Sequence, residues 1–260
     1  MFYIEVSPVA FTIGPISVAW YGIMVALAVL TVVTWALVMT RREPGIRSEV
    51  VINAALVGIP SGIVFSRLFH VADHWSYYSQ HLNEIIGGSG LAIYGAVLGA
   101  TLGIFVYSRF RKMPFGRLAD VVAPGIILGQ AIGRVGCTFN GCCYGVESHA
   151  FCAVVYTSQQ TNAPINIPVL PTHIFEIVFN LMLFGGLLLL RKRLRPDGSL
   201  FLVYLALYSA WRFGIDFVRE GTPFLFGLHE AQVIAIVVFI IAAALMVRRT
   251  RWVKEEEAVE

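Results

Sequence analysis

Residues 199–219 read SLFLVYLALYSAWRFGIDFVR, a long apolar run with charged side chains only near its end. A helix needs about 20 mostly apolar residues to cross the hydrocarbon core of a bilayer, so this run predicts a transmembrane helix. Arg212, Asp216 and Arg219 stand at positions i, i+4 and i+7, which places them on one face of that helix. We therefore expect Asp216 to hold both guanidinium groups.

Six further runs of similar length and character fill most of the chain. The 260 residues are 57% hydrophobic and 13% charged, against about 25% charged in soluble domains. The polar and apolar residues do not alternate as in a transmembrane β-barrel. We predict an all-α, polytopic membrane protein with one domain over residues 1–260, surrounded by membrane lipids and without a nucleic-acid partner. Its expected parts are a surface arm at 1–15, spans at 16–39, 50–71, 91–108, 118–136, 173–190, 199–219 and 229–248, and an outward loop at 137–172.

Lysine and arginine are distributed unevenly between the two ends of the predicted spans. Cytoplasmic loops of membrane proteins carry an excess of these residues. The opposite loops, near 72–90, 137–172 and 220–228, contain none. We therefore predict the amino terminus outside and the carboxy terminus in the cytoplasm. Fifteen basic residues follow the first, third, fifth and seventh spans: Arg41, Arg42, Arg47, Arg109, Arg111, Lys112, Arg117, Arg191, Lys192, Arg193, Arg195, Arg248, Arg249, Arg251 and Lys254.

Of the nineteen basic residues, Arg67, Arg134, Arg212 and Arg219 remain, each in the outward half of a span or at its outer edge. An arginine at the centre of a membrane helix costs about 2.5–3.5 kcal/mol on insertion scales, so such residues usually have a function. Near a span's end the side chain can reach the interface, and Arg67 and Arg219 fit simple anchoring as well. The excess of arginine over Asp216 favours an anionic ligand, with a structural ion pair as the alternative.

Other polar side chains are predicted at the same depth. His173 and Glu176 lie three residues apart on one face of the fifth span, and Tyr21 and Tyr94 fall in the outward third of theirs. The tyrosines also fit an interfacial aromatic belt. No further ligands stand at a suitable spacing from His173 and Glu176, so we predict no metal site. The predicted site opens toward the outer leaflet.

Glycines flank Arg134 at the end of the fourth span. Gly129, Gly133 and Gly136 allow a helix end to approach a neighbouring helix or a ligand closely. Exposed backbone N–H groups beside Arg134 would suit a phosphate. Helix packing alone would explain these glycines equally well.

All four cysteines lie in the same outward segment: Cys137, Cys142, Cys143 and Cys152. An oxidising exterior permits disulfides. The sequence does not choose among the three possible connectivities. We expect a disulfide that fixes the loop, rather than a zinc or redox site, because no C-x-x-C motif is present.

The order of these motifs resembles that of the bacterial phosphatidylglycerol–prolipoprotein diacylglyceryl transferases over nearly the whole chain. A single Gly-Arg-x-Gly motif would be weak, but the combination is specific. The residues that carry the resemblance are Ile13-Gly14-Pro15, Trp20-Tyr21-Gly22, Gly133-Arg134-Val135-Gly136, Asn140-Gly141, Gly145, Pro171 through Glu176, and Arg212 with Asp216 and Arg219.

The resemblance implies a seven-span enzyme of the bacterial plasma (inner) membrane with its active site facing the outer leaflet. It would move the diacylglyceryl group of phosphatidylglycerol onto the lipobox cysteine of a prolipoprotein and release glycerol phosphate, without a cofactor. The implied catalytic residues are Arg134, Arg212, Tyr94 and Tyr21. The implied substrate-binding residues are Arg134, Asn140, Gly145 and Arg219, supported by Glu176, Asp216, Arg67 and His173.

This chain departs from the family pattern at three positions. Tyr94-Gly95-Ala96 stands where the family usually has His-Gly-Gly, so the resemblance leaves the general base unidentified. Cys137 and Cys142 stand where an asparagine and an acidic residue are usual. The chain is therefore expected to be a divergent member. Two alternatives stay open, namely a transporter for an organic anion and a related lipid transferase with a different acceptor.

Overall fold

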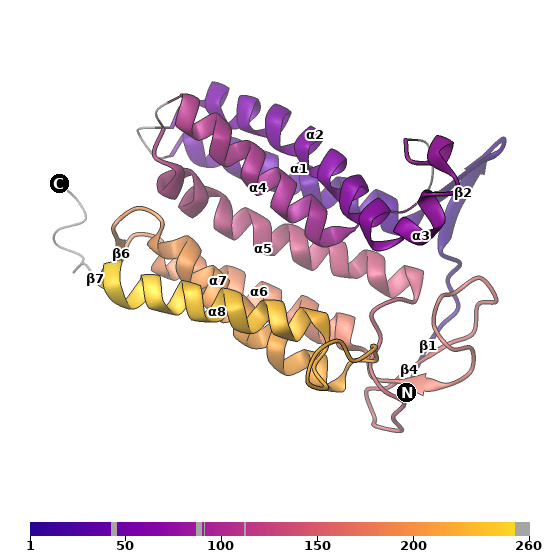
Figure 1. Cartoon of the computed structure of the whole chain (residues 1–260). Coiled ribbons are helices and arrows are strands. Elements are labelled where there is room, and N and C mark those ends of the chain that lie inside the picture. The colour runs from indigo at the N-terminus through magenta and orange to yellow at the C-terminus, as the bar shows by residue number, and fades with distance from the viewer. Residues whose placement is uncertain (43–45, 87–89, 91, 112, 253–260) are drawn as a thin grey trace. The chain divides into compact units, whose positions relative to one another are not determined.

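The computed structural model describes residues 1–252 apart from 43–45, 87–89, 91 and 112 (Figure 1). Lys112 and Lys254 of the basic set lie outside the described residues. Seven of the described helices are long and apolar enough to cross a membrane, which confirms the polytopic helical fold. These helices are α1 (Trp20–Thr40), α2 (Ser48–Asp73), α4 (Ile93–Phe110), α5 (Phe115–Asn140), α6 (Thr172–Leu190), α7 (Ser199–Ile215) and α8 (Glu230–Arg249). The span that contains α7 continues through the turn that follows it, to Val218.

The first helix begins four residues later than predicted. Residues 16–19 form strand β3 (Ile16–Ala19), which pairs with β2 (Val9–Ile13) in an antiparallel hairpin. Gly14 lies in the turn with φ of 58°, a left-handed conformation that glycine adopts without strain. Part of the expected first span is therefore extended.

Helices α5 and α7 also end elsewhere than expected. α5 continues to Asn140, so residues 137–140 are helical and the loop that follows covers residues 141–171. α7 ends at Ile215, and the short 3-10 turn η2 (Asp216–Val218) follows it. The backbone of Arg219 is already extended, with φ of −98° and ψ of 141°. The span predicted at 199–219 is therefore found, but it is a regular α-helix only as far as Ile215.

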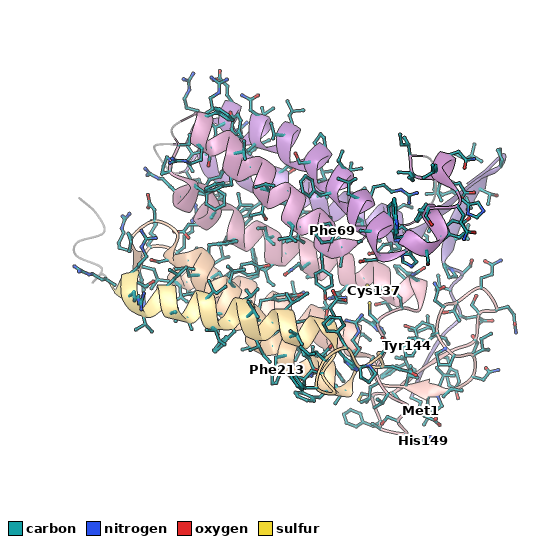
Figure 2. All side chains as sticks on the ribbon, viewed as in Figure 1. Met1, Phe69, Cys137, Tyr144, His149 and Phe213 are labelled. Atoms are coloured by element: carbon teal, nitrogen blue, oxygen red, sulfur yellow. The ribbon has the colours of Figure 1, made fainter. Side chains whose placement is uncertain are left out.

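The amino-terminal segment pairs with the 141–171 loop. Strand β1 (Phe2–Ile4) runs parallel to β4 (Val154–Tyr156), which pairs antiparallel with β5 (Pro168–Val169). The amino group of Met1 donates to the Phe151 carbonyl at 3.0 Å. Figure 2 shows Met1, Tyr144 and His149 at the same end of the helices. The predicted surface arm is thus attached to this loop by backbone hydrogen bonds.

The chain forms two compact units, of which unit 1 comprises Met1–Trp35 and Ala119–Glu260. Within unit 1, Asp120 on α5 accepts hydrogen bonds from the backbone N–H groups of Gly198 and Phe201 at 2.7 and 2.8 Å. The carboxylate thereby satisfies backbone donors at the start of α7. Beyond this end, strands β6 (Leu194–Arg195) and β7 (Arg251–Trp252) pair. The apolar core joins α5, α6 and α7 through Ala123, Ile127, Leu183, Leu187, Leu200 and Tyr204.

Unit 2 comprises Ala36–Leu118 and is built on the close approach of α2 and α4. It also contains α3 (Trp75–Tyr78) and the 3-10 turn η1 (Leu82–Glu84). A Cβ at Gly99 would meet the Phe65 side chain and would lie 2.6 Å from the Ser61 carbonyl oxygen. Small residues allow such close contact between membrane helices. Gly99 therefore sets the distance between α2 and α4.

Replacing Gly99 by alanine should destabilise unit 2, because the new methyl group would force the α2 backbone away. Overpacking of this kind costs about 1–3 kcal/mol, which should lower the apparent Tm of the purified protein in detergent. Gly185→Ala on α6 is the matched control, since a Cβ there meets nothing within 4 Å. Equal Tm values for the two variants would contradict the packing argument.

Candidate active site

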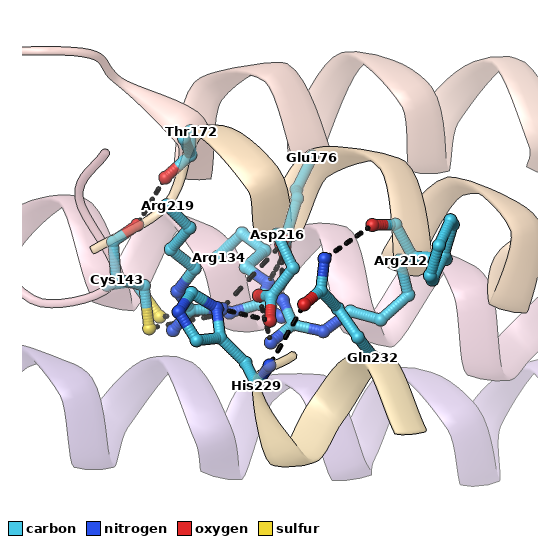
Figure 3. A network of polar contacts seen from close by, with 11 residues as sticks. Arg134, Cys143, Thr172, Glu176, Arg212, Asp216, Arg219, His229 and Gln232 are labelled. Atoms are coloured by element: carbon cyan, nitrogen blue, oxygen red, sulfur yellow. Dashed lines mark hydrogen bonds and ion pairs between the residues drawn. The ribbon is translucent and has the colours of Figure 1, made fainter. Parts of the chain in front are cut away.

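The carboxylate of Glu176 lies at the centre of a buried group of ion pairs in unit 1 (Figure 3). Glu176 stands in α6, with 2% of its surface exposed. Its Oε2 pairs with Nε of Arg134 on α5, and its Oε1 accepts a hydrogen bond from Nη1 of Arg212 on α7 at 3.0 Å. Nη1 of Arg219 lies 3.9 Å from the same Oε1. One carboxylate therefore gathers three of the four arginines that the charge pattern singles out.

Asp216 is the second buried carboxylate of this cluster. The expected contact with Arg212 is confirmed, because Arg212 Nη2 lies 3.0 Å from Asp216 Oδ1. The other oxygen, Oδ2, lies 3.1 Å from Nδ1 of His229. In the described part of the chain Asp216 forms no ion pair with Arg219, contrary to the prediction, because the helix ends at Ile215 and the i+7 spacing no longer applies.

The cluster carries an excess of positive charge. Arg134, Arg212 and Arg219 contribute +3 and the carboxylates of Glu176 and Asp216 contribute −2, which leaves +1. The arginine side chains are 15–18% exposed and both carboxylates 3%. Guanidinium groups are planar, permanently charged and able to contact two oxygens at once. The exposed edge of the cluster is therefore suited to a phosphate.

His229 and Gln232 complete the cluster, although the sequence analysis does not single them out. His229 precedes α8 and its backbone N–H donates to Gln232 Oε1 at 2.9 Å. Gln232 Nε2 donates to the Phe213 carbonyl at 3.4 Å. A residue that caps a helix, followed three positions later by glutamine and an apolar run, is a recognisable sign of a helix start. His229 does not match the usual Ser or Thr at the first position of that sign, so the sequence pattern does not reveal its contact with Asp216.

Arg134 offers its side chain to the site, and not its backbone. The N–H groups of residues 129–140 belong to helix α5, in which backbone donors are hydrogen-bonded internally. The expectation of exposed N–H groups beside Arg134 is therefore wrong. Nη1 of Arg134 lies 3.6 Å from Sγ of Cys143 and 3.9 Å from Sγ of Cys137. One guanidinium group thus contacts both Glu176 and a pair of thiols.

All four cysteines are free thiols in the structure. The Sγ atoms of Cys137, Cys142 and Cys143 nevertheless lie within 4.8 Å of one another. Hydrogen bonds from the Cys137 and Cys142 thiols, assisted by Arg219 and Arg134, lower the pKa of the Cys143 thiol. The sequence leads us to expect a disulfide here, whereas the structure holds these thiols unpaired.

Gly145 fixes the backbone from which Arg219 extends. Its N–H donates to the Leu170 carbonyl at 2.8 Å, and it forms a β-bridge with Arg219. A Cβ at Gly145 would lie 2.5 Å from the Val218 carbonyl oxygen and 2.8 Å from the Leu170 Cβ. Only glycine fits, and this close approach directs the side chain of Arg219 toward Glu176.

Thr172 and His173 attach the start of α6 to the 141–171 loop. Thr172 Oγ1 donates to the Cys143 carbonyl. The fully buried His173 places Nε2 3.5 Å from the Tyr156 hydroxyl, whose pKa is raised by burial. Tyr156 therefore stays protonated and can act as a hydrogen-bond donor. These contacts hold the turn of α6 that precedes Glu176.

Asn140 and Tyr21, two further residues expected at the site, also belong to unit 1. Asn140 ends α5, and both its Oδ1 and its carbonyl oxygen accept hydrogen bonds from Nδ2 of Asn162 at 3.2 and 3.0 Å. Tyr21 lies near the start of α1 and is 39% exposed. Its Cα would lie 3.3 Å from a Cβ at Gly136, so α1 and α5 approach each other closely here.

Arg67 and Tyr94 belong to unit 2. The guanidinium of Arg67 donates to the carbonyls of Ile85, Glu84 and Gly90 at 2.8, 2.6 and 3.0 Å. These bonds show that Arg67 supports the loop between α2 and α4. Tyr94 is half-buried near the start of α4.

A hollow opens beside the cluster within unit 1. It has a volume of about 330 Å³ and is lined by Cys143, Tyr144, Arg219 and residues 220–222. Arg219 and the thiol of Cys143 are thus accessible to a molecule that enters from this side.

Known proteins are similar to this chain over nearly its full length. The family described as prolipoprotein diacylglyceryl transferase matches residues 8–248. A phosphatidylglycerol–prolipoprotein diacylglyceryl transferase of Dehalococcoides mccartyi is 48% identical over 257 residues, which are 99% of both chains. The enzymes of that name from Symbiobacterium thermophilum and Bacillus licheniformis are 38% and 36% identical, over 93% and 94% of this chain and 92% of each relative.

Replacing Glu176 by glutamine should destabilise the protein, because three clustered guanidinium groups would lose their shared counter-charge. Removing one partner of a buried ion pair costs about 3–5 kcal/mol. The apparent Tm in detergent should fall clearly. Glu147→Gln is the control, since Glu147 is an exposed residue of the 141–171 loop. An unchanged Tm for Glu176→Gln would show that the carboxylate does not organise the arginines.

Proposed function

Because the chain belongs to the prolipoprotein diacylglyceryl transferase family, we propose that it transfers the diacylglyceryl group of phosphatidylglycerol to the cysteine thiol of a prolipoprotein. The products are a thioether on the protein and glycerol phosphate. Family membership makes the chain a membrane-bound transferase. The observation that supports the proposed chemistry best is the cluster of three arginines on Glu176, with its net positive charge.

The reaction requires stabilisation of a leaving phosphate. A thiolate attacks a glycerol carbon, and the bond from that carbon to a phosphate oxygen breaks. Negative charge then grows on the phosphate oxygens, and fixed positive groups that face them lower the barrier. Arg134 and Arg212 are our candidates for this contact, and Arg219 is the candidate for binding the head group.

The carboxylates orient the arginines before the substrate arrives. Arg134 and Arg212 are held on Glu176, and Arg212 is held again by Asp216. Groups that are already in place need not reorganise during the reaction. Nη1 of Arg219 is buried, lies 3.9 Å from Glu176 Oε1 and makes no hydrogen bond to the described residues. In our proposal this donor is available to a phosphate oxygen.

The resemblance supports further assignments that the cluster alone does not carry. We assign Tyr21 and Tyr94 to the catalytic set, Asn140 and Gly145 to substrate binding, and His173 and Arg67 to support. The contacts of the 141–171 loop support the roles of Gly145 and His173. Gly145 helps to fix the segment that carries Arg219, and His173 helps to fix the segment that carries Glu176.

We place the enzyme in the bacterial plasma (inner) membrane with its site facing the outer leaflet. The distribution of lysine and arginine supports this orientation, because these residues follow α1, α4, α6 and α8. Loops rich in these residues stay in the cytoplasm. The arginine cluster lies toward the opposite ends of α5, α6 and α7, where a lipobox cysteine would emerge from the membrane.

A transfer assay tests the proposed function directly. Purified protein in detergent receives phosphatidylglycerol labelled in its head group and a peptide with a lipobox cysteine. Glycerol phosphate and the thioether peptide should appear in equal amounts. Release of glycerol phosphate without the thioether, or no turnover at all, would count against the proposal.

Arg134→Lys and Arg212→Lys should each lower the transfer rate by at least about 100-fold, as expected when one donor to a developing charge is lost. Lysine keeps the charge but cannot contact two oxygens in one plane. Arg248→Lys, an exposed residue near the end of α8, serves as the control and should leave the rate unchanged. A rate near normal for Arg134→Lys would remove Arg134 from the reaction.

A further inference from the structure

Three cysteines of unit 1 meet at the end of α5, next to Arg134. The Sγ atoms of Cys137, Cys142 and Cys143 all lie within 4.8 Å of one another, and all three thiols are free. Cys137 is 5% exposed, and the other two are half-buried. The described residues bring no fourth histidine, cysteine, aspartate or glutamate into this group. The cluster therefore offers three soft sulfur ligands and, among the described residues, no fourth protein ligand.

The backbone after α5 is folded so that these thiols converge. The N–H of Cys142 donates to the Cys137 carbonyl at 3.2 Å. Gly141 and Cys143 have φ of 65° and 63°, in the left-handed region. A residue other than glycine is uncommon there and persists only where surrounding contacts impose it. Thr172 supplies such a contact by its bond to the Cys143 carbonyl. The fold thus maintains an unfavourable conformation that keeps Cys143 beside the other two thiols.

We propose that Cys137, Cys142 and Cys143 bind a divalent ion of the zinc type, whose fourth position receives the acceptor thiol. This role rests on the proposed transfer to a prolipoprotein cysteine. Zinc binds thiolate sulfur at about 2.3 Å in tetrahedral geometry, which separates the sulfurs by roughly 3.8 Å. The observed spacing needs an adjustment of at most about 1 Å. Three protein ligands and one open position are the pattern of catalytic zinc sites.

The charges around the cluster fit this ion. Three thiolates and one divalent cation sum to −1, and the neighbouring arginine cluster carries +1. Nη1 of Arg134 lies 3.6 and 3.9 Å from two of the sulfurs and can donate to them. Such contacts from a second layer of residues orient and tune metal ligands. Arg134 would then stabilise the metal centre and the phosphate together.

The metal would favour the deprotonated form of the acceptor thiol. A free thiol has a pKa near 8.5 and is mostly protonated at neutral pH. The carboxylates of Glu176 and Asp216 are already occupied by arginine and His229. A thiol that coordinates a metal ion loses its proton. The bound ion therefore replaces a general base.

The step is balanced without an oxidant or reductant. The acceptor thiol releases its proton to water when its sulfur binds the ion. The sulfur then forms a bond to the glycerol carbon, while the bond from that carbon to the phosphate oxygen breaks and its electron pair stays on the oxygen. The hollow of about 330 Å³ beside Cys143 and Arg219 gives access to both groups. In this proposal the two reactants meet beside Cys143 and Arg219.

Metal binding is tested first, without reference to activity. The purified protein in detergent is reduced, stripped with a chelator and exposed to zinc or cobalt chloride. One ion per chain should bind, and cobalt should give the intense near-ultraviolet absorption of thiolate coordination. Cys137→Ser, Cys142→Ser and Cys143→Ser should each weaken binding at least about tenfold, whereas Cys152→Ser should not. The cobalt spectrum of the unsubstituted chain does not depend on how the variants fold.

Equal metal binding by all four variants, or no thiolate absorption with cobalt, would overturn the site. So would disulfides among the three cysteines in protein purified without reductant. The transfer assay then tests the catalytic role. The stripped protein should lose at least nine-tenths of its rate and regain it with zinc. Full activity after stripping would overturn the role of the metal and leave the proposed function standing. Zinc bound by the three cysteines in a protein that makes no thioether would support the site and contradict the proposed function.

Discussion

The arrangement of the site depends on the ion pairs that Glu176 forms with the arginines around it. Three arginines from different parts of unit 1 would repel one another if they were brought together without a counter-charge. A buried carboxylate on α6 pairs with Arg134 from α5 and Arg212 from α7, and lies 3.9 Å from Arg219. The desolvation cost of these groups is offset only because each carboxylate oxygen is engaged. Because the two carboxylates do not neutralise the three arginines, the cluster keeps the positive charge that a phosphate needs.

The surrounding fold is arranged to support that cluster. The 141–171 loop, which pairs with β1 at the amino terminus, is fixed to the start of α6 by Thr172 and His173. Gly145 holds the extended segment of Arg219 by close backbone contact. The same loop carries Cys142 and Cys143, so one piece of irregular structure positions both the segment of Arg219 and two of the thiols. In a membrane protein such backbone is tolerated where protein surrounds it.

Much of this could be predicted from composition and periodicity. Seven apolar runs predicted seven helices, and the topology rule left four arginines unexplained, three of which meet at Glu176. The remainder depends on tertiary contacts. A seven-residue spacing does not reveal that α7 ends at Ile215, nor that Arg219 consequently turns from Asp216 to Glu176. Arg67 resembles the other arginines in sequence, yet its guanidinium is occupied by loop carbonyls. The three thiols come together because residues after α5 adopt left-handed backbone conformations, and the spacing of the cysteines does not predict those conformations.

We propose that the excess positive charge of the three arginines around Glu176 binds the phosphate of the lipid. A structure of the protein with bound phosphatidylglycerol tests it most directly. We predict phosphate oxygens within hydrogen-bond distance of the guanidinium groups of Arg134 and Arg219, with Glu176 still paired to Arg134 and Arg212. A head group bound away from these arginines, with the ion pairs of Glu176 and Asp216 unchanged, would contradict it.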